Sequence, residues 1–422
     1  MSFSTLGLNS SLLETLTARG YSTPTPVQRA AIPAALAGID LLVSSQTGSG
    51  KTAAFLLPAL QRLATVAPTG RGAGPRILVL APTRELALQV DKAAHTYGDG
   101  QRLRTACLVG GMPYGLQLKQ LGKPVDIVIA TPGRLKDHLD RGRIDLARVE
   151  VLVLDEADRM LDMGFVEDIE AIVARTPATR QTLLFSATLD GVVGRLAQRV
   201  TRAAQRIDIA ASAVHDAKID QRALFADDLP HKTRLLDALL RDTDIRQALV
   251  FTATKQSAED LSGALREQGF SAGALHGDMR QRERNLTLQH LRDGRMRVLV
   301  ATDVAARGLD VPGISHVINF DAPRQAEDYV HRIGRTGRAG RAGFAVTLLA
   351  HREKHLVHSI ERYTGNALRV AVIPGLEPVA RAERTPRPRT ESSRRNNGGG
   401  WKVSPEWKTS TRPTNQRRRA GN

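Results

Sequence analysis

Short runs of aliphatic residues recur through most of the chain, and segments with the spacing of amphipathic helices separate them. In the first half, these runs predict buried strands over residues 41–43, 77–80, 125–129, 151–154 and 182–185. In the second half, they predict strands over residues 248–251, 298–301, 316–319 and 344–349. The segments between the strands, such as 52–63 and 84–94, have helical periodicity. This alternation predicts an α/β fold with parallel sheets covered by helices on both faces.

Breaks in the pattern predict two domains and a tail. Residues 211–218 have no strong pattern, so we expect them to link a first domain, residues 1–210, to a second, residues 219–374. Residues 375–422 are rich in Pro, Gly, Ser and Thr and contain twelve basic and four acidic residues. Because few aliphatic side chains are available for burial, this last segment is predicted to be a disordered basic tail.

The overall charge indicates a polyanionic partner. The 422 residues carry a net charge of +17, whereas roughly 2–8 charges suffice for solubility, and nucleic acid is the commonest polyanion. The single cysteine, Cys107, excludes a disulfide framework and a cysteine-based zinc site, and it fits a reducing compartment. Because no apolar run has membrane-spanning length and the first residues lack the pattern of a signal peptide, we expect a cytoplasmic protein without a membrane partner.

Residues 44–52 have the composition of a phosphate-binding loop between a predicted strand and a predicted helix. Glycines such as Gly48 and Gly50 let backbone N–H groups turn toward phosphate oxygens, and a helix N-terminus adds a favourable dipole. Lys51 is placed to reach the β- and γ-phosphates, and the Thr52 hydroxyl to ligate Mg²⁺. Ser45 stands where the general motif has glycine. The alternative is an ordinary Gly/Ser-rich turn before a helix.

An acidic segment, Asp155-Glu156-Ala157-Asp158, follows the strand predicted at 151–154. Ligands of doubly wound sheets lie beyond the carboxyl ends of the strands, so these carboxylates should face the same crevice as the phosphate loop. Asp155 would hold Mg²⁺, and Glu156 would orient the attacking water or accept its proton. Alone, such a segment is more often a solvated helix start, but its pairing with Lys51 favours a functional site.

The same segment carries a family resemblance. Asp-Glu-Ala-Asp is the name-giving motif of the DEAD-box RNA helicases, and the chain resembles this family over about residues 3–373. The opening residues and the short basic tail look most like the bacterial RhlE-type branch. The family's other motifs stand in order: the Q motif at 20–28 with Phe3 upstream, motif Ia at 82–86, the doublet Gly110-Gly111, motif Ib at 131–134, motif III at 186–188, motif IV at 250–252, the QxxR element at 281–284, motif V at 301–310 and motif VI at 331–338.

The resemblance implies two tandem RecA-like domains of the P-loop class that use ATP and Mg²⁺, the metal being held by Thr52 and Asp155. Arg335 and Arg338 would act as arginine fingers beside the catalytic residues Lys51, Asp155 and Glu156, so hydrolysis would need both domains. The alternative for these arginines is a basic patch that touches only RNA phosphates. The implied nucleotide-binding residues are Phe3, Gln28, Thr47, Gly48, Ser49, Gly50, Lys51, Thr52 and Asp310. Gln28 would read the adenine edge, while Phe3 would either stack on adenine or anchor the core.

The resemblance also implies an RNA-facing set and a coupling set. The RNA-facing residues are Arg84, Gly111, Thr131, Gly133, Arg134, Thr252, Gly277, Gln281, Arg284 and Thr302. Their small, hydroxyl, amide and guanidinium groups suit phosphates and 2′-hydroxyls without reading bases. The residues expected to couple the nucleotide state to strand separation are Asp158, Ser186, Thr188 and His331, although His331 could equally be a buried structural histidine.

These features predict RNA-stimulated ATP hydrolysis coupled to local unwinding of short RNA duplexes and to remodelling of RNA–protein complexes, with little sequence specificity. Two alternatives stay open, an ATP-gated RNA clamp and a DNA-directed helicase. The expected partners are single-stranded and short duplex RNA, and the family suggests ribosome-assembly or RNA-degradation complexes. The tail would tether RNA through its arginines and through Trp401 and Trp407, or it would only aid solubility.

Overall fold

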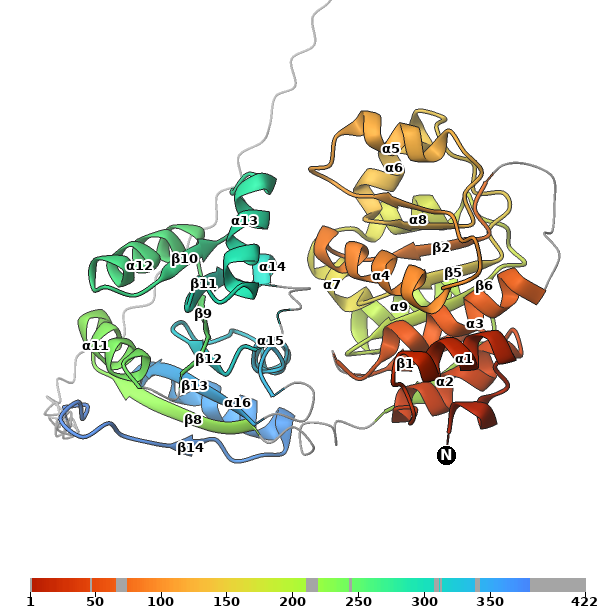
Figure 1. Cartoon of the computed structure of the whole chain (residues 1–422). Coiled ribbons are helices and arrows are strands. Elements are labelled where there is room, and N and C mark those ends of the chain that lie inside the picture. The colour runs from red at the N-terminus through yellow and green to blue at the C-terminus, as the bar shows by residue number, and fades with distance from the viewer. Residues whose placement is uncertain are drawn as a thin grey trace, which may run out of the picture. The chain divides into compact units, whose positions relative to one another are not determined.

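The computed structural model describes residues 2–45, 48–65, 74–209, 219–242, 245–306, 311, 313–337 and 342–379. Within these residues the chain forms two separate sheets of seven parallel strands each. Helices flank both sheets (Figure 1). The predicted α/β fold with two doubly wound domains is therefore confirmed. The predicted linker, residues 211–218, and residues 380–422 of the predicted tail lie outside the described part of the chain.

The first sheet has the strand order β3-β4-β2-β5-β6-β1-β7. Its strands are β1 (Leu41–Ser44), β2 (Ile77–Leu80), β3 (Thr105–Leu108), β4 (Ile127–Ala130), β5 (Val151–Leu154), β6 (Gln181–Ser186) and β7 (Gln205–Asp208). The four central strands β2, β4, β5 and β6 are buried along their whole length, as expected of parallel strands covered on both faces.

The second sheet repeats this order with the next seven strands, as β10-β11-β9-β12-β13-β8-β14. They are β8 (Ile219–Ala226), β9 (Ala248–Thr252), β10 (Ala272–Leu275), β11 (Val298–Thr302), β12 (His316–Asn319), β13 (Gly343–Ala350) and β14 (Arg369–Val370). Strand for strand, the two domains therefore share one topology, a repeat that the sequence does not reveal.

Several helices begin at a residue whose side chain caps the first turn. Thr83, for example, accepts a hydrogen bond from the Leu86 N–H at the start of its helix. In the first domain the helical segments are η1 (Phe3–Leu6), α1 (Ser10–Ala18), α2 (Pro26–Leu36), α3 (Lys51–Thr65), α4 (Arg84–Tyr97), α5 (Tyr114–Leu121), α6 (Pro132–Asp140), α7 (Ala157–Asp162), α8 (Val166–Val173) and α9 (Gly191–Val200). In the second they are α11 (Leu229–Leu240), α12 (Lys255–Glu267), α13 (Gln281–Arg292), α14 (Asp303–Ala306), α15 (Ala326–Ile333), η2 (His351–Glu353) and α16 (Lys354–Thr364).

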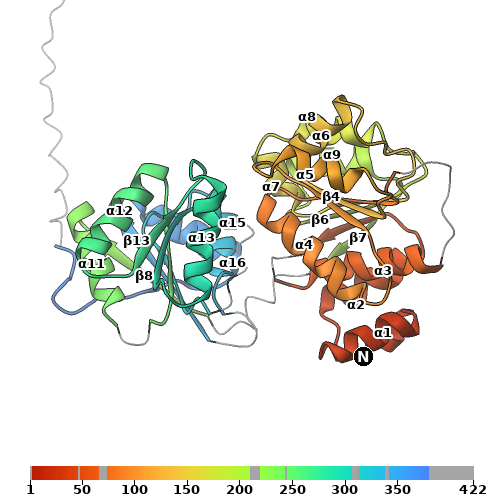
Figure 2. The ribbon, with the colours of Figure 1, turned by 45° about the horizontal axis from the view of Figure 1, so that its top comes forward.

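Alternate residues of each strand feed opposite cores, because side chains along a strand point to opposite faces. Leu41 and Val43 join the core formed with α1, α2, α3 and α4, whereas Leu42 packs against the core formed with α6, α7, α8 and α9. These two helix groups lie on opposite sides of the first sheet (Figure 2). The second sheet is arranged alike, with α11 and α12 on one face and α13 to α16 on the other.

All nine predicted strands are present, three with identical boundaries and six with boundaries shifted by one or two residues. The five strands that the hydrophobic pattern missed are β3, β7, β8, β10 and β14. β3 has one large aliphatic residue, β10 is mostly Ala and Gly, β8 contains the polar run 220–222, and the edge strands β7 and β14 are mostly exposed, so none forms a run of large aliphatic residues. Among the helices described, none has the length and apolarity to cross a membrane.

Candidate nucleotide and RNA site

The phosphate loop, the predicted metal carboxylate and one of the predicted coupling residues follow three neighbouring strands, β1, β5 and β6. The phosphate loop leaves β1, Asp155 follows β5, and Ser186 ends β6. Because all three strands are parallel, their carboxyl ends lie at one edge of the sheet. The strand order therefore brings together groups that lie more than a hundred residues apart in the sequence.

Within the phosphate loop, the structure describes Gly48, Ser49 and Gly50, whereas Thr47 lies outside the described residues. Gly48 and Gly50 have backbone φ angles of +83° and +91°, which L side chains rarely adopt. Lys51 is buried and its Nζ donates to the Ser45 carbonyl over 3.0 Å. The amine is thus held beside the loop, while Thr52 stands one residue into α3 with a partly exposed side chain. This arrangement suits phosphate binding at a helix N-terminus.

The Q motif is attached directly to this loop. The Nε2 of Gln28 donates to the Gly50 carbonyl over 3.1 Å, and its Oε1 accepts from the Thr25 N–H over 2.9 Å. The amide retains one donor hydrogen and one acceptor lone pair, so it can still bond an adenine edge. Phe3 lies in the hydrophobic core with 5% exposure, as the core-anchor alternative expects. It also borders a hollow of about 280 Å³ together with Tyr21.

Asp155 is almost fully buried, and its Oδ1 has no hydrogen-bond partner among the described residues. Burial raises the pKa of this carboxyl to about 7, with Lys51 opposing and Glu156 reinforcing the rise. A buried acceptor without a donor is costly, and a hard cation is the group that satisfies such an oxygen. The residues present therefore fit Mg²⁺.

Glu156 is one of two non-glycine residues with a positive φ among those described, at +52°. This left-handed conformation costs free energy for a residue with a side chain, and it falls between the buried strand β5 and the start of α7. Such strain, at a carboxylate beside the aspartate predicted to hold the metal, is typical of functional sites.

Asp158 and the segment 186–188 form a hydrogen-bonded unit. The Asp158 N–H donates to Ser186 Oγ over 3.3 Å, and its carboxylate accepts from the Ala187 N–H over 3.1 Å. The Thr188 N–H also donates to Ser186 Oγ over 3.3 Å. The end of β6 is therefore tied to the acidic segment that follows β5, so a displacement of one displaces the other.

The RNA-facing residues of the first domain follow the other three strands, β3, β4 and β2, which are also neighbours. Two predicted arginines reach the same loop, residues 109–112. Arg84 Nη1 donates to the Gly110 carbonyl and Arg134 Nη1 to the Met112 carbonyl, each over 3.4 Å. Gly111 is exposed with a φ of +71°, while Thr131 and Gly133 open α6. The structure thus gathers this set at one end of the sheet.

In the second domain the corresponding strands β10, β11 and β9 carry the second set. Thr252 ends β9, Thr302 ends β11, and Gly277 follows β10. Both threonines are buried. Gln281 begins α13, and Arg284 donates to the His276 carbonyl over 3.1 Å.

The structure describes one of the two predicted arginine fingers, Arg335. Arg335 is buried and its Nε donates to the His331 carbonyl over 3.2 Å, and His331 lies in the last turn of α15 with a partly buried side chain. Arg338 and Asp310 lie outside the described residues.

Sequence reasoning missed the part that Arg332 plays. Its guanidinium is 3% exposed and binds both carboxylate oxygens of Asp303, over 2.6 and 2.7 Å. It also donates to Asn319 and to the Asp321 carbonyl, over 3.2 and 2.6 Å. Arg332 therefore ties motif VI to motif V inside the second domain. The sequence feature that could have indicated this ion pair is the presence of an arginine and an aspartate in two neighbouring motifs.

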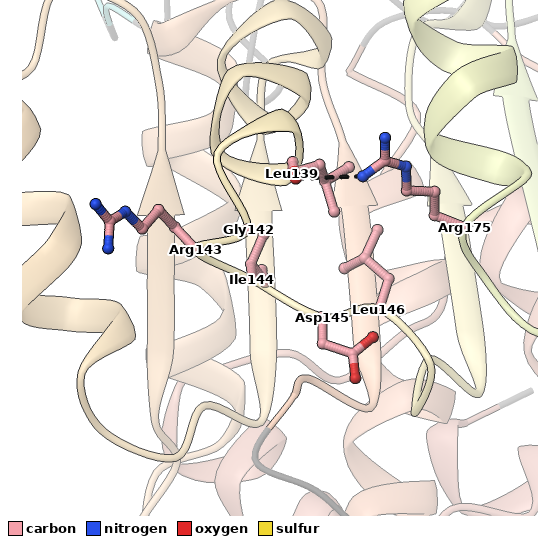
Figure 3. A pocket seen from close by; sticks show the side chains of 7 residues that line it. All are labelled: Leu139, Gly142, Arg143, Ile144, Asp145, Leu146 and Arg175. Atoms are coloured by element: carbon pink, nitrogen blue, oxygen red, sulfur yellow. Dashed lines mark hydrogen bonds between the residues drawn. The ribbon is translucent and has the colours of Figure 1, made fainter.

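A hollow of about 380 Å³ lies away from these residues, beside the loop between α6 and β5 (Figure 3). Arg175 donates to the Leu139 carbonyl there over 3.2 Å, and the Arg143 side chain points away from the other residues shown. This hollow adjoins the amino end of β5, whereas Asp155 follows the carboxyl end. It is therefore not the nucleotide site.

Comparison with known proteins bears on this site directly. A family model for DEAD/DEAH box helicases matches residues 25–196, and one for the helicase conserved C-terminal domain matches residues 231–340. The ATP-dependent RNA helicase SrmB of Escherichia coli (strain K12) is 45% identical over 381 residues, covering 90% of this chain and 86% of SrmB. The ATP-dependent RNA helicase DeaD of Klebsiella pneumoniae is 46% identical over 361 residues, which are 85% of this chain and 55% of DeaD.

Solved structures agree with these sequence matches. The structure of Saccharomyces cerevisiae Dbp5 bound to RNA and ADP BeF3 is similar with a TM-score of 0.79 and 31% identity, covering 88% of this chain and 95% of that one. Mss116p bound to ssRNA and AMP-PNP gives a TM-score of 0.78 at 27% identity, over 89% of this chain and 80% of that one. Since both domains and nearly the full length of SrmB are matched, this chain belongs to the DEAD-box family of ATP-dependent RNA helicases.

Proposed function

We propose that this protein hydrolyses ATP when RNA is bound and uses the cycle to open short RNA duplexes locally and to remodel RNA–protein complexes. One observation carries the proposal. In the first sheet, the nucleotide residues follow β5, β6 and β1, and the RNA-facing residues follow β3, β4 and β2, so both sets lie along one sheet edge.

In this proposal the phosphate loop, including Thr47, holds the triphosphate, and the Lys51 amine neutralises its β- and γ-phosphates. Gln28 offers its remaining donor and acceptor to adenine, and Phe3, buried in the core, anchors the segment that precedes the Q motif. Thr52 and Asp155 would hold Mg²⁺, which supplies charge neutralisation between the phosphates when bound. Glu156 accepts a proton from the attacking water or orients it. Asp310, Arg335 and Arg338 would complete the site from the second domain, the arginines stabilising charge in the transition state.

RNA would lie across the ends of β3, β4 and β2 in the first domain and of the equivalent β10, β11 and β9 in the second. The groups offered there are glycine backbone, hydroxyls, an amide and three arginines, which contact phosphates and 2′-hydroxyls without reading bases. The proposed action is therefore almost independent of sequence. The ATP-bound protein would bind a bent single strand more tightly than a duplex. Because ATP favours that protein conformation, ATP binding would disrupt local base pairs of a bound duplex.

The coupling path would run through Asp158, Ser186 and Thr188. Their hydrogen bonds join the acidic segment to the end of β6. Loss of the γ-phosphate near Asp155 would therefore change the position of residues 186–188. His331 would be the partner from the second domain.

The decisive experiment compares ATP hydrolysis with RNA, with DNA and with no nucleic acid, alongside unwinding of a short labelled duplex. We expect RNA alone to stimulate hydrolysis and duplex separation to require ATP. Equal stimulation by DNA would favour a DNA-directed helicase. Tight ATP-dependent RNA binding without strand separation would favour the clamp.

Several finer assignments belong to this proposal. We assign residues 1–210 and 219–374 as the two domains, joined by 211–218, with 375–422 as an RNA tether. Truncation at residue 374 tests the tether, because loss of its basic residues should flatten the slope of RNA affinity against salt concentration.

The opening residues favour the RhlE-type branch, whereas the relatives compared above bear other names. Ribosome assembly or RNA degradation in the cytoplasm is the proposed setting.

A further inference from the structure

A buried pair of polar side chains lies directly beneath the loop of residues 109–112, in which Gly110 and Gly111 are exposed. Gln117 of α5 and His138 of α6 are both fully buried. They lie on two neighbouring helices that follow β3 and β4 (Figures 1 and 2). Neither residue belongs to a helicase motif identified in the sequence, and a buried amide and a buried imidazole both need hydrogen-bond partners to be tolerated.

The orientation of the Gln117 amide follows from its partners. Its Nε2 donates to the Val109 carbonyl over 3.2 Å and to the Met112 carbonyl over 3.1 Å. Because carbonyls only accept, the NH₂ group must face the loop and Oε1 must face away from it. The two bonds flank the Gly110-Gly111 doublet, so one side chain fixes both ends of the segment predicted to meet RNA.

The His138 ring in turn fixes that amide. Its Nε2 lies 3.2 Å from Gln117 Oε1, and because Oε1 only accepts, the Nε2 must carry the hydrogen. The Nδ1 atom has no hydrogen-bond partner in the part of the chain that the structure describes. Tyr114 stacks on the same ring, with centroids 4.5 Å apart and planes 10° apart. The histidine is therefore held in one tautomer and one orientation.

The network ends on a residue already predicted to bind RNA. The Met112 carbonyl that accepts from Gln117 also accepts from Arg134, and the Arg134 guanidinium lies over the Tyr114 ring at 5.6 Å. Together with Arg84 on the Gly110 carbonyl, side chains from α4, α5 and α6 hold three carbonyls of this loop. The exposed Gly110-Gly111 doublet is therefore held at Gly110 and at the residue on either side of the doublet.

We infer that Gln117 and His138 are positioning residues for RNA binding, which hold the Gly110-Gly111 loop and Arg134 in the geometry that receives the RNA backbone. The inference rests on the proposed function, because it concerns the affinity for RNA. Neither side chain is exposed, so both act through the loop and not by contact with the RNA. Holding the loop before RNA arrives lowers the entropy lost on binding.

Gln117→Glu is the sharpest test, since it keeps the shape of the side chain but removes both donated hydrogen bonds. We expect the RNA concentration for half-maximal ATPase to rise about tenfold, as the loss of two buried hydrogen bonds would give. The rate at saturating RNA and the affinity for ATP without RNA should stay close to wild type. Gln120→Glu is the matched control, because Gln120 is exposed on the same helix and receives the same change of charge.

A buried carboxylate carries a risk of unfolding, so His138→Phe is the second variant. Phenylalanine keeps the stack on Tyr114 but cannot donate to Gln117, and a smaller rise in the RNA requirement is expected, with faster amide hydrogen exchange at residues 109–112. If both folded variants bind RNA like wild type, or if only the saturated rate falls, the inference is overturned. If wild type itself shows no response to RNA, the proposed function fails instead.

Discussion

The Nε2 of Gln28 and the carbonyl oxygen of Gly50 are joined by a hydrogen bond of 3.1 Å. This bond ties the segment predicted to read adenine to the loop predicted to bind phosphate. The contact is close enough that a Cβ added at Gly50 would lie 2.5 Å from Nε2. Base recognition and phosphate binding are therefore coupled through one backbone position.

The first prediction concerns this position. Gly50→Ala introduces both the steric overlap with Gln28 and a side chain at a φ of +91°. We expect ATP affinity to fall about tenfold further for Gly50→Ala than for Gly48→Ala, because overpacking against Gln28 costs about 1–3 kcal/mol in addition to the strain of a positive φ that both variants share. Equilibrium titrations with a fluorescent ATP analogue measure this difference. Gly48→Ala is the control, since it has a similar φ of +83° with nothing within 4 Å. Equal losses in the two variants would show that the Gln28 contact is unimportant.

The second prediction separates binding from hydrolysis. Lys51→Ala should abolish tight ATP binding, because it removes the cation beside the phosphates. Glu156→Gln should bind ATP and RNA but hydrolyse ATP at least about a hundredfold more slowly, since an amide accepts no proton from water. The protein would then stay bound to RNA with ATP present, which gel-shift assays can detect. Normal turnover by Glu156→Gln would remove the role assigned to this carboxylate.

The third prediction tests the arginine finger. Arg335→Ala should lower the ATPase rate about a thousandfold while changing ATP affinity only slightly, because a finger acts mainly on the transition state. Arg335→Lys keeps the charge but loses the planar fork and should recover only part of the rate. Equal losses of ATPase rate and ATP affinity would instead indicate that Arg335 contacts bound ATP before the transition state.

The fourth prediction concerns stability of the second domain. Arg332→Ala leaves Asp303 without its bidentate partner in a site where the arginine is buried. The Asp303 side chain is 27% exposed, so its unpaired carboxylate is partly solvated, and the lost hydrogen bonds should cost about 1–3 kcal/mol. Thermal or urea unfolding should therefore begin at milder conditions. Arg241→Ala is the control, because its pair with Asp237 lies on the surface of the same domain, where ion pairs contribute little. Similar unfolding of both variants would contradict the structural role of Arg332.

The fifth prediction is a pH dependence. Burial lowers the pKa of His138 below its ordinary value of 6.5; nearby Arg134 and Arg141 lower it further, and Asp137 opposes them. The unfolded chain then takes up the proton more readily than the folded protein. Neutral His138 therefore contributes its full share to the free energy of unfolding above about pH 6.5, and this share is lost as the pH falls through the lower folded pKa.

Unfolding temperatures measured between about pH 7.5 and pH 5 should therefore fall less steeply for His138→Phe than for wild type. If the unfolding temperatures of the two proteins fell equally with pH, protonation of His138 would not lower the stability of the folded protein.

The sequence by itself determined the class of fold and the local chemistry of the site. Aliphatic runs long enough to be buried on both faces marked nine strands, because central parallel strands need such residues. The phosphate loop, Asp155 and Glu156 were readable because their chemistry depends on residues adjacent in the chain. The short or polar strands β3, β7, β8, β10 and β14 were not readable, since their burial is set by neighbouring strands and not by their own composition.

Only the tertiary structure decided which of these groups meet. The strand order β5-β6-β1 brings Asp155 and Ser186 to the phosphate loop, and no local pattern encodes the order of strands. The bond from Gln28 to Gly50, the burial of Arg332 against Asp303 and the support of the Gly110-Gly111 loop by Gln117 and His138 likewise join separate elements. Hydrogen bonds of this kind depend on distances between side chains in space, which the packing of helices on the sheet fixes and the sequence pattern does not.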